Sequence, residues 1–544
     1  MVNNKNFTLT VVLTLAAAMF SNNLTTDTSS PTGQQIQLLG RESPTTQKIG
    51  MNLPTHRRYE TQIPFVDVFK QTGGYAGGSS WQTDDAITYD SNNYPIEIVP
   101  PDEAFTLFGG NPYAAYPGGT YTLIMEGSGT LELGYDASGT FDQDGGEHSY
   151  QVNVDPTNLG LKFKITRSNI NDNLRNIRFI MPGHENTYLT QPFYPLFLDR
   201  LRPFSPIRLM QWQRINDAQI TSWEERTKLS YSTQTTDHGP AYEYGIWMAN
   251  AIDSDIWWSV PVRGDDDFIM NLAQLTLDNL DQELKVYLEY SNELWRPTDQ
   301  RTYAVEQGLA LWPGIANNDA ARRWTAKRSA KIFEIFNDVF GRESNRIVKI
   351  IPVWSGQTSY SDDILDAFAQ TDIDGVLVNP NEIDPDAITG APYFGRHVFD
   401  EIMQAGTQDT ITVPEIIGML GGSHLDHGIQ RMTNDKDLLD EYNALHGWNM
   451  ELLAYEGGQA LMATPPANYP PLEEKLKEAN RHPGMYNIYE QYFDAWKGLT
   501  DSPFVYFNFV KKYINNDPFG ALEHLDQNPE KVSKYKFLID RAEK

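Results

Sequence analysis

Two glutamates end two apolar stretches of the sequence, and their side chains could carry out acid–base or nucleophilic chemistry. Glu293, preceded by Asn292, follows the run Val286–Tyr290, and Glu456 follows Leu452–Tyr455. If both runs are parallel strands of a (β/α)₈ barrel, their carboxyl groups lie at the C-terminal face, where barrel enzymes do their chemistry. Glycoside hydrolysis needs such a pair, because one carboxylic acid protonates the leaving oxygen while a carboxylate stands opposite it.

The separation of the two carboxyl groups would decide the stereochemistry of that reaction. A separation of about 5–5.5 Å makes the second carboxylate a nucleophile and retains the anomeric configuration, whereas a wider one admits a water molecule and inverts it. The residues alone leave both outcomes open.

The segment 173–544 alternates strand and helix patterns, which predicts a (β/α)₈ TIM barrel with insertions. A long helical region is expected over 299–340, where apolar pairs recur at three- and four-residue steps. The longest insertion is expected at 398–450, between the sixth and seventh strands. The eight predicted strands are 177–181, 207–212, 255–261, 286–292, 347–354, 387–393, 451–456 and 504–509.

The segment 61–172 has a different period. Apolar residues alternate in short runs separated by Gly-rich and Asp-Pro turns, which predicts a small antiparallel β-sandwich preceding the barrel. This domain is interpreted as a structural partner of the barrel, with a sugar-binding module, including Trp81, as the alternative. The polar segment 22–60 is expected to be a linker or lead-in.

Composition restricts the functions that this chain can have. The 544 residues carry a net charge of −29, which disfavours nucleic acid and anionic membranes as partners, and there is no cysteine for disulfides or thiolate chemistry. Residues 1–21 resemble a secretory signal peptide, so a secreted protein, extracellular or periplasmic, is expected. An uncleaved membrane anchor is the alternative. The oligomeric state is left open.

The Asn-Glu pair after the fourth predicted strand and the single Glu after the seventh resemble clan A of the glycoside hydrolases, the retaining barrel enzymes of the 4/7 superfamily. More narrowly, Glu-Tyr-Ser-Asn-Glu-Leu-Trp at 289–295 and Tyr-Glu-Gly-Gly-Gln at 455–459 are similar to a group of secreted bacterial proteins with a β-domain before the barrel. The resemblance covers roughly 173–540 and rests on these two motifs.

The resemblance implies particular roles for five residues. Glu293 would be the acid/base, Glu456 the nucleophile, and Asn292 a hydrogen-bond partner of the sugar 2-hydroxyl, an interaction that strengthens in the transition state. Tyr393, after the sixth strand, would touch the nucleophile, and Arg214 would be the arginine that often follows the second strand. The chain departs from the clan at the third strand, where several members carry a His that this sequence lacks.

The local sequence is consistent with the two carboxyl roles. A general acid needs a raised pKa and a nucleophile a lowered one. Leu294 and Trp295 favour a dry environment beside Glu293, and Gly457 with Gly458 lets a substrate or a neighbouring loop approach Glu456 closely. Three tryptophans are predicted to stack on sugar rings, and half of the strand tryptophans are expected to belong to the core instead. The three are Trp212, Trp295 and Trp354.

No metal or cofactor is expected. His424 and His427 lack a third ligand at a useful spacing. Asp265–Asp267 is interpreted as a helix N-cap rather than a calcium site. The sequence contains no serine-esterase, zinc-protease, phosphate-loop or dinucleotide motif.

Together these features predict a secreted retaining glycoside hydrolase that acts on a polysaccharide or oligosaccharide by double displacement. The alternatives are a transglycosylase with the same residues and a non-catalytic carbohydrate-binding protein. A polysaccharide lyase is disfavoured by the acidic balance and by the Glu pair.

Overall fold

The computed structural model describes residues 46–542, apart from 78–86, 110–115, 158, 217, 464–468 and 515. The expected signal segment 1–21, the first part of the expected lead-in and Trp81 therefore lie outside the described residues. Among the helices that can be described, none has both the length and the apolar character needed to cross a bilayer.

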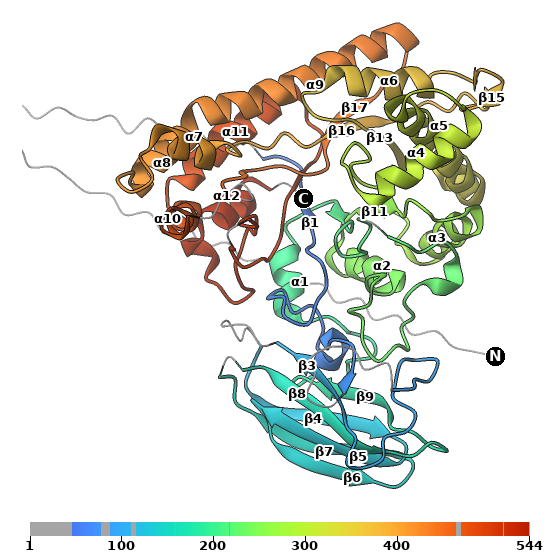
Figure 1. The fold of residues 1–544 in the computed structure, drawn as a ribbon, viewed down its shortest axis with the longest axis vertical. Coiled ribbons are helices and arrows are strands. Elements are labelled where there is room, and N and C mark those ends of the chain that lie inside the picture. Colours follow the sequence, from blue (N-terminus) through green and yellow to red (C-terminus); the bar gives the residue numbers. More distant parts are fainter. Residues whose placement is uncertain are drawn as a thin grey trace, which may run out of the picture. The chain divides into compact units, whose positions relative to one another are not determined.

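Within the described residues, eight parallel strands close into a barrel, with helices around it (Figure 1). The last strand pairs with the first, so the sheet has no open edge. The predicted (β/α)₈ architecture is thereby confirmed. In order around the barrel the strands are β1 (Ile49–Asn52), β10 (Ile207–Arg208), β11 (Ile256–Val260), β12 (Val286–Tyr290), β13 (Ile347–Pro352), β16 (Ala387–Gly390), β17 (Glu451–Ala454) and β18 (Phe504–Tyr506).

The first barrel strand is not the predicted one. It is β1, which lies inside the expected lead-in 22–60, whereas the predicted first strand 177–181 largely coincides with β9 (Arg175–Ile180) of an antiparallel sheet. Strand β1 is only four residues long and contains Gly50, so it gives a weak strand signal. That glycine is required by packing, since a Cβ there would lie 2.6 Å from the Pro206 carbonyl oxygen.

The residues between β1 and β10 form two antiparallel sheets in the described part of the chain. One has the strand order β2-β3-β8-β5-β6 and the other the order β7-β4-β9. Phe163 of β8 and Phe179 of β9 are in edge-to-face contact across the sheets, with ring centroids 5.3 Å apart. The antiparallel region therefore follows the first barrel strand instead of preceding the barrel. Its remaining strands are β2 (Ala76–Gly77), β3 (Ala104–Phe108), β4 (Gly119–Glu126), β5 (Gly129–Tyr135), β6 (Gly139–Gln143), β7 (Glu147–Val154) and β8 (Leu161–Ser168).

The helices lie close to their predicted positions. The expected insertion 398–450 between β16 and β17 is present and is mostly helical, and a short hairpin, β14 (Asp372–Ile373) with β15 (Val376–Leu377), precedes β16. The helices are α1 (Pro195–Leu201), α2 (Tyr242–Ile252), α3 (Asp266–Asn279), α4 (Asp299–Leu311), α5 (Asn317–Phe340), α6 (Thr358–Phe368), α7 (Val398–Ala405), α8 (Val413–Met419), α9 (Leu425–His446), α10 (Pro470–Arg481), α11 (Met485–Leu499) and α12 (Ser533–Arg541). Short 3₁₀ or π turns are η1 (Val68–Gln71), η2 (Trp223–Glu225), η3 (Gly341–Arg346), η4 (Leu420–His424) and η5 (Pro529–Lys531).

Two helix predictions can be checked at residue level. Asp265 caps α3 as predicted, since its carboxylate accepts a hydrogen bond of 2.7 Å from the Phe268 backbone N–H. The helical period expected in 299–340 is also confirmed, because Phe333, Phe336 and Phe340 of α5 face the core.

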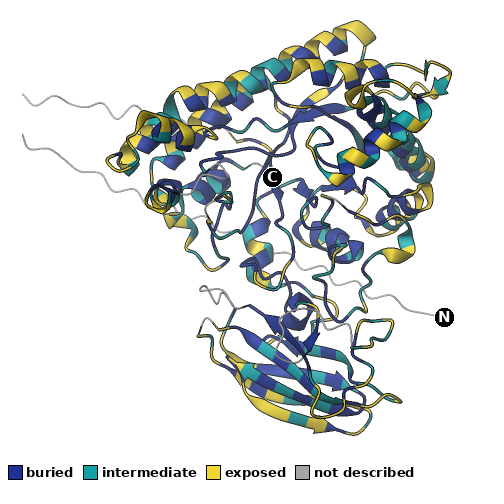
Figure 2. Cartoon of the chain, in the orientation of Figure 1, coloured by how far each residue is buried: buried dark blue, intermediate teal, exposed yellow. Residues whose placement is uncertain are grey.

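The barrel interior sets the positions of the functional side chains. Figure 2 shows the barrel strands as mostly buried. Side chains alternate along a strand, so the inward residues form layers. One layer is apolar and contains Trp257 of β11 and Tyr287 of β12, which are register partners. Two residues further along, Ser259 and Glu289 are partners in turn, so Glu289 lies in the next layer toward the C-terminal ends.

Candidate active site

The structure places Glu293 and Glu456 at the C-terminal ends of the fourth and seventh barrel strands. Glu293 follows the end of β12 by three residues, and Glu456 follows the end of β17 by two. Because all barrel strands are parallel, both residues lie on the same face of the barrel. Both glutamates were predicted to follow the fourth and seventh barrel strands, and they do. The wrong choice of first strand does not change this numbering, because β1 replaces 177–181 as strand one.

A tight turn after β12 presents Asn292 and Glu293. Ser291 and Glu293 have left-handed backbone conformations, with φ of 59° and 46°. Such conformations cost a non-glycine residue about 1–2 kcal/mol and need support from their surroundings. That support is present, because the Ser291 N–H donates to the Val260 carbonyl at 2.8 Å and the Gln300 side chain donates to the Asn292 carbonyl.

Arg208, the last residue of β10, connects the two sides of the site. Its Nη1 donates to Glu456 Oε1 at 3.0 Å, and its Nη2 donates to Asn292 Oδ1 at 2.9 Å. The same guanidinium donates to Glu289 through Nε and Nη2, at 3.2 and 3.0 Å, and to Asn52 Oδ1 at 3.1 Å. One buried cation therefore orients the candidate nucleophile and the candidate sugar-binding amide together.

Arg208 is fully buried and remains charged. Its guanidinium lies 4.8 Å from the Tyr455 ring centroid and 5.8 Å from that of Trp257. Burial by itself lowers the pKa of Arg208, but the attraction of Glu289 and then of Glu456 outweighs it, so the pKa lies above its ordinary value. A cation held in this way makes hydrogen bonds of fixed geometry to the carboxylates around it.

Glu456 is enclosed by protein groups. Its side chain is 8% exposed, and its second oxygen, Oε2, accepts a hydrogen bond of 3.0 Å from the Tyr393 hydroxyl. Burial raises the pKa of Glu456 to about 7, against the opposing effect of Arg208. The lowered pKa expected for a nucleophile is therefore wrong for this structure, because burial, together with the nearby charge of Glu293, outweighs the attraction of Arg208.

The two glycines after Glu456 leave room for side chains of the neighbouring strand β18. A Cβ on Gly457 would collide with the Phe504 ring of β18, and one on Gly458 would lie 2.8 Å from the Tyr506 ring. Gly458 also has a φ of +116°, a conformation that side chains disfavour. The expected close approach to Glu456 is therefore made by β18, which packs against this turn.

Glu293 is held on both of its oxygens. Oε1 accepts a hydrogen bond of 3.0 Å from the Tyr455 hydroxyl, and Oε2 is paired with Arg296 at 2.8 Å. Burial, followed by the charges of Glu293 and Glu456, raises the pKa of Tyr455, so this hydroxyl stays protonated and donates. Tyr455 precedes Glu456 in the chain and bonds to Glu293, so it links the two carboxyl groups.

Asn292 is fixed at both ends of its amide. Its Oδ1 accepts from Arg208, and its Nδ2 donates to Asn216 Oδ1 at 2.9 Å. Asn216 lies in the segment after β10 and was not singled out in the sequence, where a polar residue in a loop carries no local signal. The structure thus supplies an oriented amide next to Glu293 in the chain.

The predicted aromatic platforms divide into two groups. Trp295 and Trp354 are stacked, with ring centroids 6.0 Å apart and planes at 6°, and Trp354 is 40% exposed. Trp212 is fully buried against His56 and Phe65, so the prediction that it stacks on a sugar is wrong. It lies four residues after the end of β10, and its ring packs in the core against the rings of His56 and Phe65.

The arginine predicted for the site is also a different one. Arg214 pairs with the exposed Asp237 at 2.9 Å, and Arg208 makes the contacts to Glu456 and Asn292. A charged residue within the apolar run Ile207–Met210 is unusual and could have identified Arg208 from the sequence. The same signal applies to Glu289, which lies inside the apolar strand β12.

The histidine pair of the insertion does not form a ligand set. His424 Nε2 lies 3.2 Å from Glu401 Oε2. Within the described ranges there is no group of three or more His, Asp or Glu residues arranged to hold a metal ion. The carboxyl groups of the candidate site are instead held by Arg208, Tyr393, Tyr455 and Arg296.

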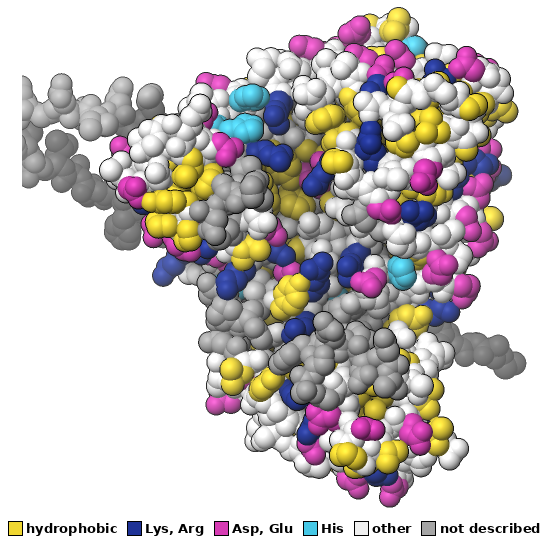
Figure 3. All heavy atoms as spheres, viewed as in Figure 1, with side chains coloured by type: hydrophobic (Ala, Val, Ile, Leu, Met, Phe, Trp, Pro, Cys, Tyr) yellow, Lys and Arg dark blue, Asp and Glu magenta, His cyan; other side chains and the backbone are white. Residues whose placement is uncertain are grey.

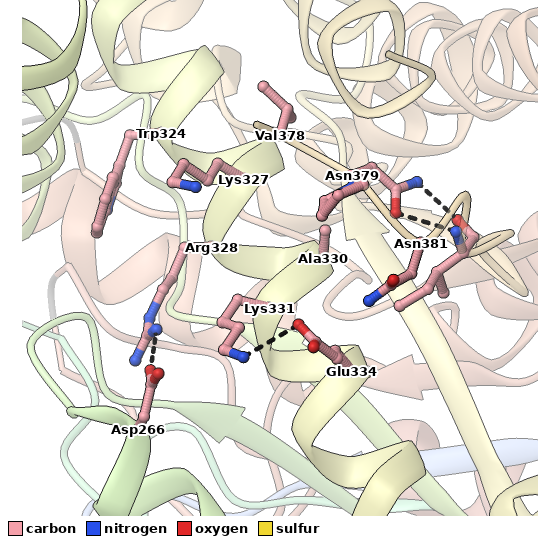
Figure 4. Close-up of a pocket in the computed structure, with 12 residues that line it drawn as sticks. Asp266, Trp324, Lys327, Arg328, Ala330, Lys331, Glu334, Val378, Asn379 and Asn381 are labelled. Carbon is pink, nitrogen blue, oxygen red and sulfur yellow. Dashed lines mark hydrogen bonds and ion pairs between the residues drawn. The ribbon is translucent and has the colours of Figure 1, made fainter. Parts of the chain in front are cut away.

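Two cavities of the described part of the chain are lined by residues outside the candidate site. One, of about 280 Å³, is lined by side chains of α5 and of the segment 378–383, and in it Arg328 faces Asp266 while Lys331 pairs with Glu334 (Figure 4). The other, of about 590 Å³, is lined by Trp247 and residues around α1. Neither cavity includes a residue of the Glu pair or its hydrogen-bond partners. Figure 3 shows acidic side chains spread among Lys and Arg on the visible face, so the negative net charge is not gathered into one patch there.

Comparison with known proteins adds little to this geometry. No family model matches the chain. No curated protein matches it either. Among solved structures, it is similar to a β-glycosidase from Pyrococcus horikoshii, with 15% identity, coverage of 66% of this chain and 85% of that one, and a TM-score of 0.33.

Two further solved structures have similar scores. An endo-laminarinase from Formosa Hel1_33_131 has 12% identity, covers 60% of this chain and 84% of its own, and has a TM-score of 0.28. The GH53 catalytic domain from Ignisphaera aggregans has 8% identity, coverage of 63% and 88%, and a TM-score of 0.28. Similarities of this size carry no argument about function, which rests on the site itself.

Proposed function

We propose that the chain is a retaining glycoside hydrolase, with Glu293 as the acid/base and Glu456 as the nucleophile. The observation that carries this proposal is made at the C-terminal ends of the fourth and seventh strands of a closed parallel barrel. There the buried Arg208 donates to both Glu456 and Asn292, and Tyr455, the residue before Glu456, donates to Glu293. A pair of carboxyl groups with different surroundings is the arrangement that glycoside hydrolysis uses.

In the first step, a carboxylate oxygen of Glu456 attacks the anomeric carbon while Glu293 transfers a proton to the glycosidic oxygen. The bond between that carbon and oxygen breaks, and a glycosyl ester of Glu456 forms. In the second step Glu293 removes a proton from water, the water oxygen attacks the anomeric carbon, and Glu456 leaves. Arg208 and Tyr393 hold Glu456 in place throughout, which avoids reorganisation at the moment of reaction.

The ionisation of Glu456 predicts the pH dependence. A nucleophile must be deprotonated, and burial raises the pKa of Glu456 to about 7. We expect kcat/KM to fall as the pH drops through about 7, because Glu456 becomes protonated there. An acid limb centred near the ordinary value of a glutamate would contradict this.

The substrate class is argued from the aromatic pair. Trp295, two residues after Glu293, stacks on the exposed Trp354, which gives a flat apolar surface next to the acid/base. Sugar rings pack on such surfaces, so the proposed substrate is a polysaccharide or longer oligosaccharide rather than a disaccharide.

We also propose that the protein is exported, because residues 1–21 resemble a signal peptide. The two antiparallel sheets are proposed to form an accessory β-sandwich domain.

The test is reducing-end release from a panel of neutral and acidic polysaccharides, with wild type beside Glu456→Gln and Glu293→Gln. Loss of release in both variants supports the proposal, whereas activity that survives in both overturns it. Glu451→Gln is the matched control, because it removes one carboxylate from the other end of β17. Binding of a polysaccharide without release would favour the carbohydrate-binding alternative, and formation of longer products would favour a transglycosylase.

The retaining mechanism has its own measurement. Proton NMR of the first product formed should show the same anomeric configuration as the substrate. The opposite configuration would show that water, and not Glu456, attacks the anomeric carbon.

A further inference from the structure

Glu289 is a third carboxylate of the site, and the proposed reaction does not use it. It lies in β12, four residues before Glu293, and is fully buried in the barrel interior. We propose that Glu289 is a positioning residue, which holds Arg208 in place and shares its positive charge with Glu456. This inference deepens the proposed function, because it rests on Glu456 being the nucleophile.

The contacts of Glu289 are concentrated on one oxygen. Oε2 accepts from Arg208 Nε at 3.2 Å, from Arg208 Nη2 at 3.0 Å, from Trp257 Nε1 at 2.9 Å and from Ser259 Oγ at 3.2 Å. Oε1 has no hydrogen-bond partner among the described residues. Four donors therefore converge on one oxygen, which fixes the position of the Glu289 side chain against Arg208, Trp257 and Ser259.

These contacts also determine how Arg208 is oriented. Glu289 takes Nε and shares Nη2, which leaves Nη1 to Glu456 and Asn52. A guanidinium is a rigid planar fork, so fixing one edge fixes the direction of the other. Glu289 thus aims the N–H group that holds the proposed nucleophile, and its own hydrogen bonds are to Arg208, Trp257 and Ser259.

The charge balance follows from the same geometry. Arg208 carries one positive charge between two buried carboxylates, Glu289 and Glu456. Glu456 additionally faces Glu293, the Tyr393 hydroxyl and the neighbouring Tyr455. Burial raises the pKa of Glu456 to about 7 against the attraction of Arg208, a cation that is also paired with Glu289.

Removing the charge of Glu289 therefore has a definite direction. In Glu289→Gln the amide oxygen can still accept from Trp257, Ser259 and Arg208, but the full charge of Arg208 then faces Glu456. We expect the pKa of Glu456 to fall by about one unit. A purely structural role of Glu289 would lower stability or activity at every pH without moving this titration.

The experiment measures the Glu456 carboxyl directly, so it needs no substrate. Protein with ¹³C-labelled glutamate carboxyl carbons is titrated by NMR, and the Glu456 resonance is assigned by its absence in Glu456→Gln. Wild type is compared with Glu289→Gln and with Glu451→Gln, which removes a charge of the same sign from the far end of β17. A midpoint about one unit lower in Glu289→Gln alone is the expected result.

An unchanged midpoint in folded Glu289→Gln would overturn the inference, and so would an equal shift in Glu451→Gln. If Glu289→Gln does not fold, Glu289→Asp provides the test, because its shorter side chain moves the carboxylate away from Arg208. It should shift the midpoint in the same direction by a smaller amount, and no shift in folded Glu289→Asp would equally overturn the inference. Failure of hydrolysis by wild type concerns the proposed function and leaves this titration interpretable.

Discussion

The two carboxyl groups of the candidate site lie in contrasting surroundings. On the Glu456 side, the proposed nucleophile is bound by Arg208 and Tyr393, and Arg208 is completely buried. On the Glu293 side, the ion-pair partner is Arg296, whose side chain is 58% exposed, and the carboxyl group stands on a left-handed turn beside stacked tryptophans. One half of the site is a fixed internal network, and the other half has a cation that is largely exposed.

This difference matches the different tasks that we propose for Glu456 and Glu293. A nucleophile gains from a fixed position and from exclusion of water, because the geometry of attack is then set in advance. An acid/base has to exchange protons with a substrate oxygen and later with water, so it needs access. Loss of the buried Arg208 on the Glu456 side should therefore reduce stability strongly, whereas loss of Arg296 on the Glu293 side should cost little stability.

The largest effect is expected from Arg208→Met. This change leaves Glu289 and Glu456 buried without their shared cation, so the free energy of unfolding at neutral pH should fall by about 3–5 kcal/mol. Denaturant unfolding measures this loss. Arg214→Met is the matched control, since it breaks only the pair with exposed Asp237 and should cost less than about 1 kcal/mol. Equal losses of unfolding free energy in Arg208→Met and Arg214→Met would show that the buried pairs of Arg208 contribute no more to stability than the exposed pair of Arg214.

Tyr393→Phe should have a large effect on chemistry with little effect on the fold. It removes one hydrogen bond to Glu456 Oε2, and we expect kcat/KM to fall about 10- to 100-fold. The Tyr393 hydroxyl lowers the pKa of Glu456, so its removal should move the acid limb of the pH profile to higher pH. A limb that stays in place, or moves down, would show that this hydroxyl does not stabilise the carboxylate.

A smaller and more specific effect is expected from Trp354→Ala. This side chain is exposed and stacks on Trp295, so its loss should raise KM for a polymeric substrate about three- to tenfold with little change in kcat. Trp212→Phe is the comparison, because that ring is buried and should affect unfolding but not KM. A raised KM in Trp212→Phe with none in Trp354→Ala would reverse the assignment of the platforms.

The smallest effect on stability is expected from Arg296→Gln. The Arg296 side of its ion pair with Glu293 is largely exposed, so the free energy of unfolding should change by less than about 1 kcal/mol. Thermal unfolding measures this change. A loss comparable with that of Arg208→Met would show that the Glu293 side is as much a part of the core as the Glu456 side.

The site could be predicted from the sequence where a local pattern marks it. Apolar runs ending in Glu293 and Glu456 identify strand ends, and a parallel barrel then brings both to one face. Tyr393 lies in contact with Glu456, as the resemblance implied. The short strand β1 was not predicted, because four residues that include a glycine give little periodicity. Since β1 was missed, the antiparallel region was predicted to precede the barrel instead of following its first strand.

What the sequence by itself determined is the alternation of strands and helices, the strand ends that carry the two glutamates, and the cap of α3. These follow from short-range physics, since side-chain period, turn residues and capping act over a few positions. Only the tertiary structure decided that Arg208 rather than Arg214 reaches the site, that Trp212 is buried, and that Glu289 shares the cation with Glu456. Those outcomes depend on which inward-facing residues of different strands meet inside the closed barrel, because burial and charge are set by neighbours that are distant in sequence.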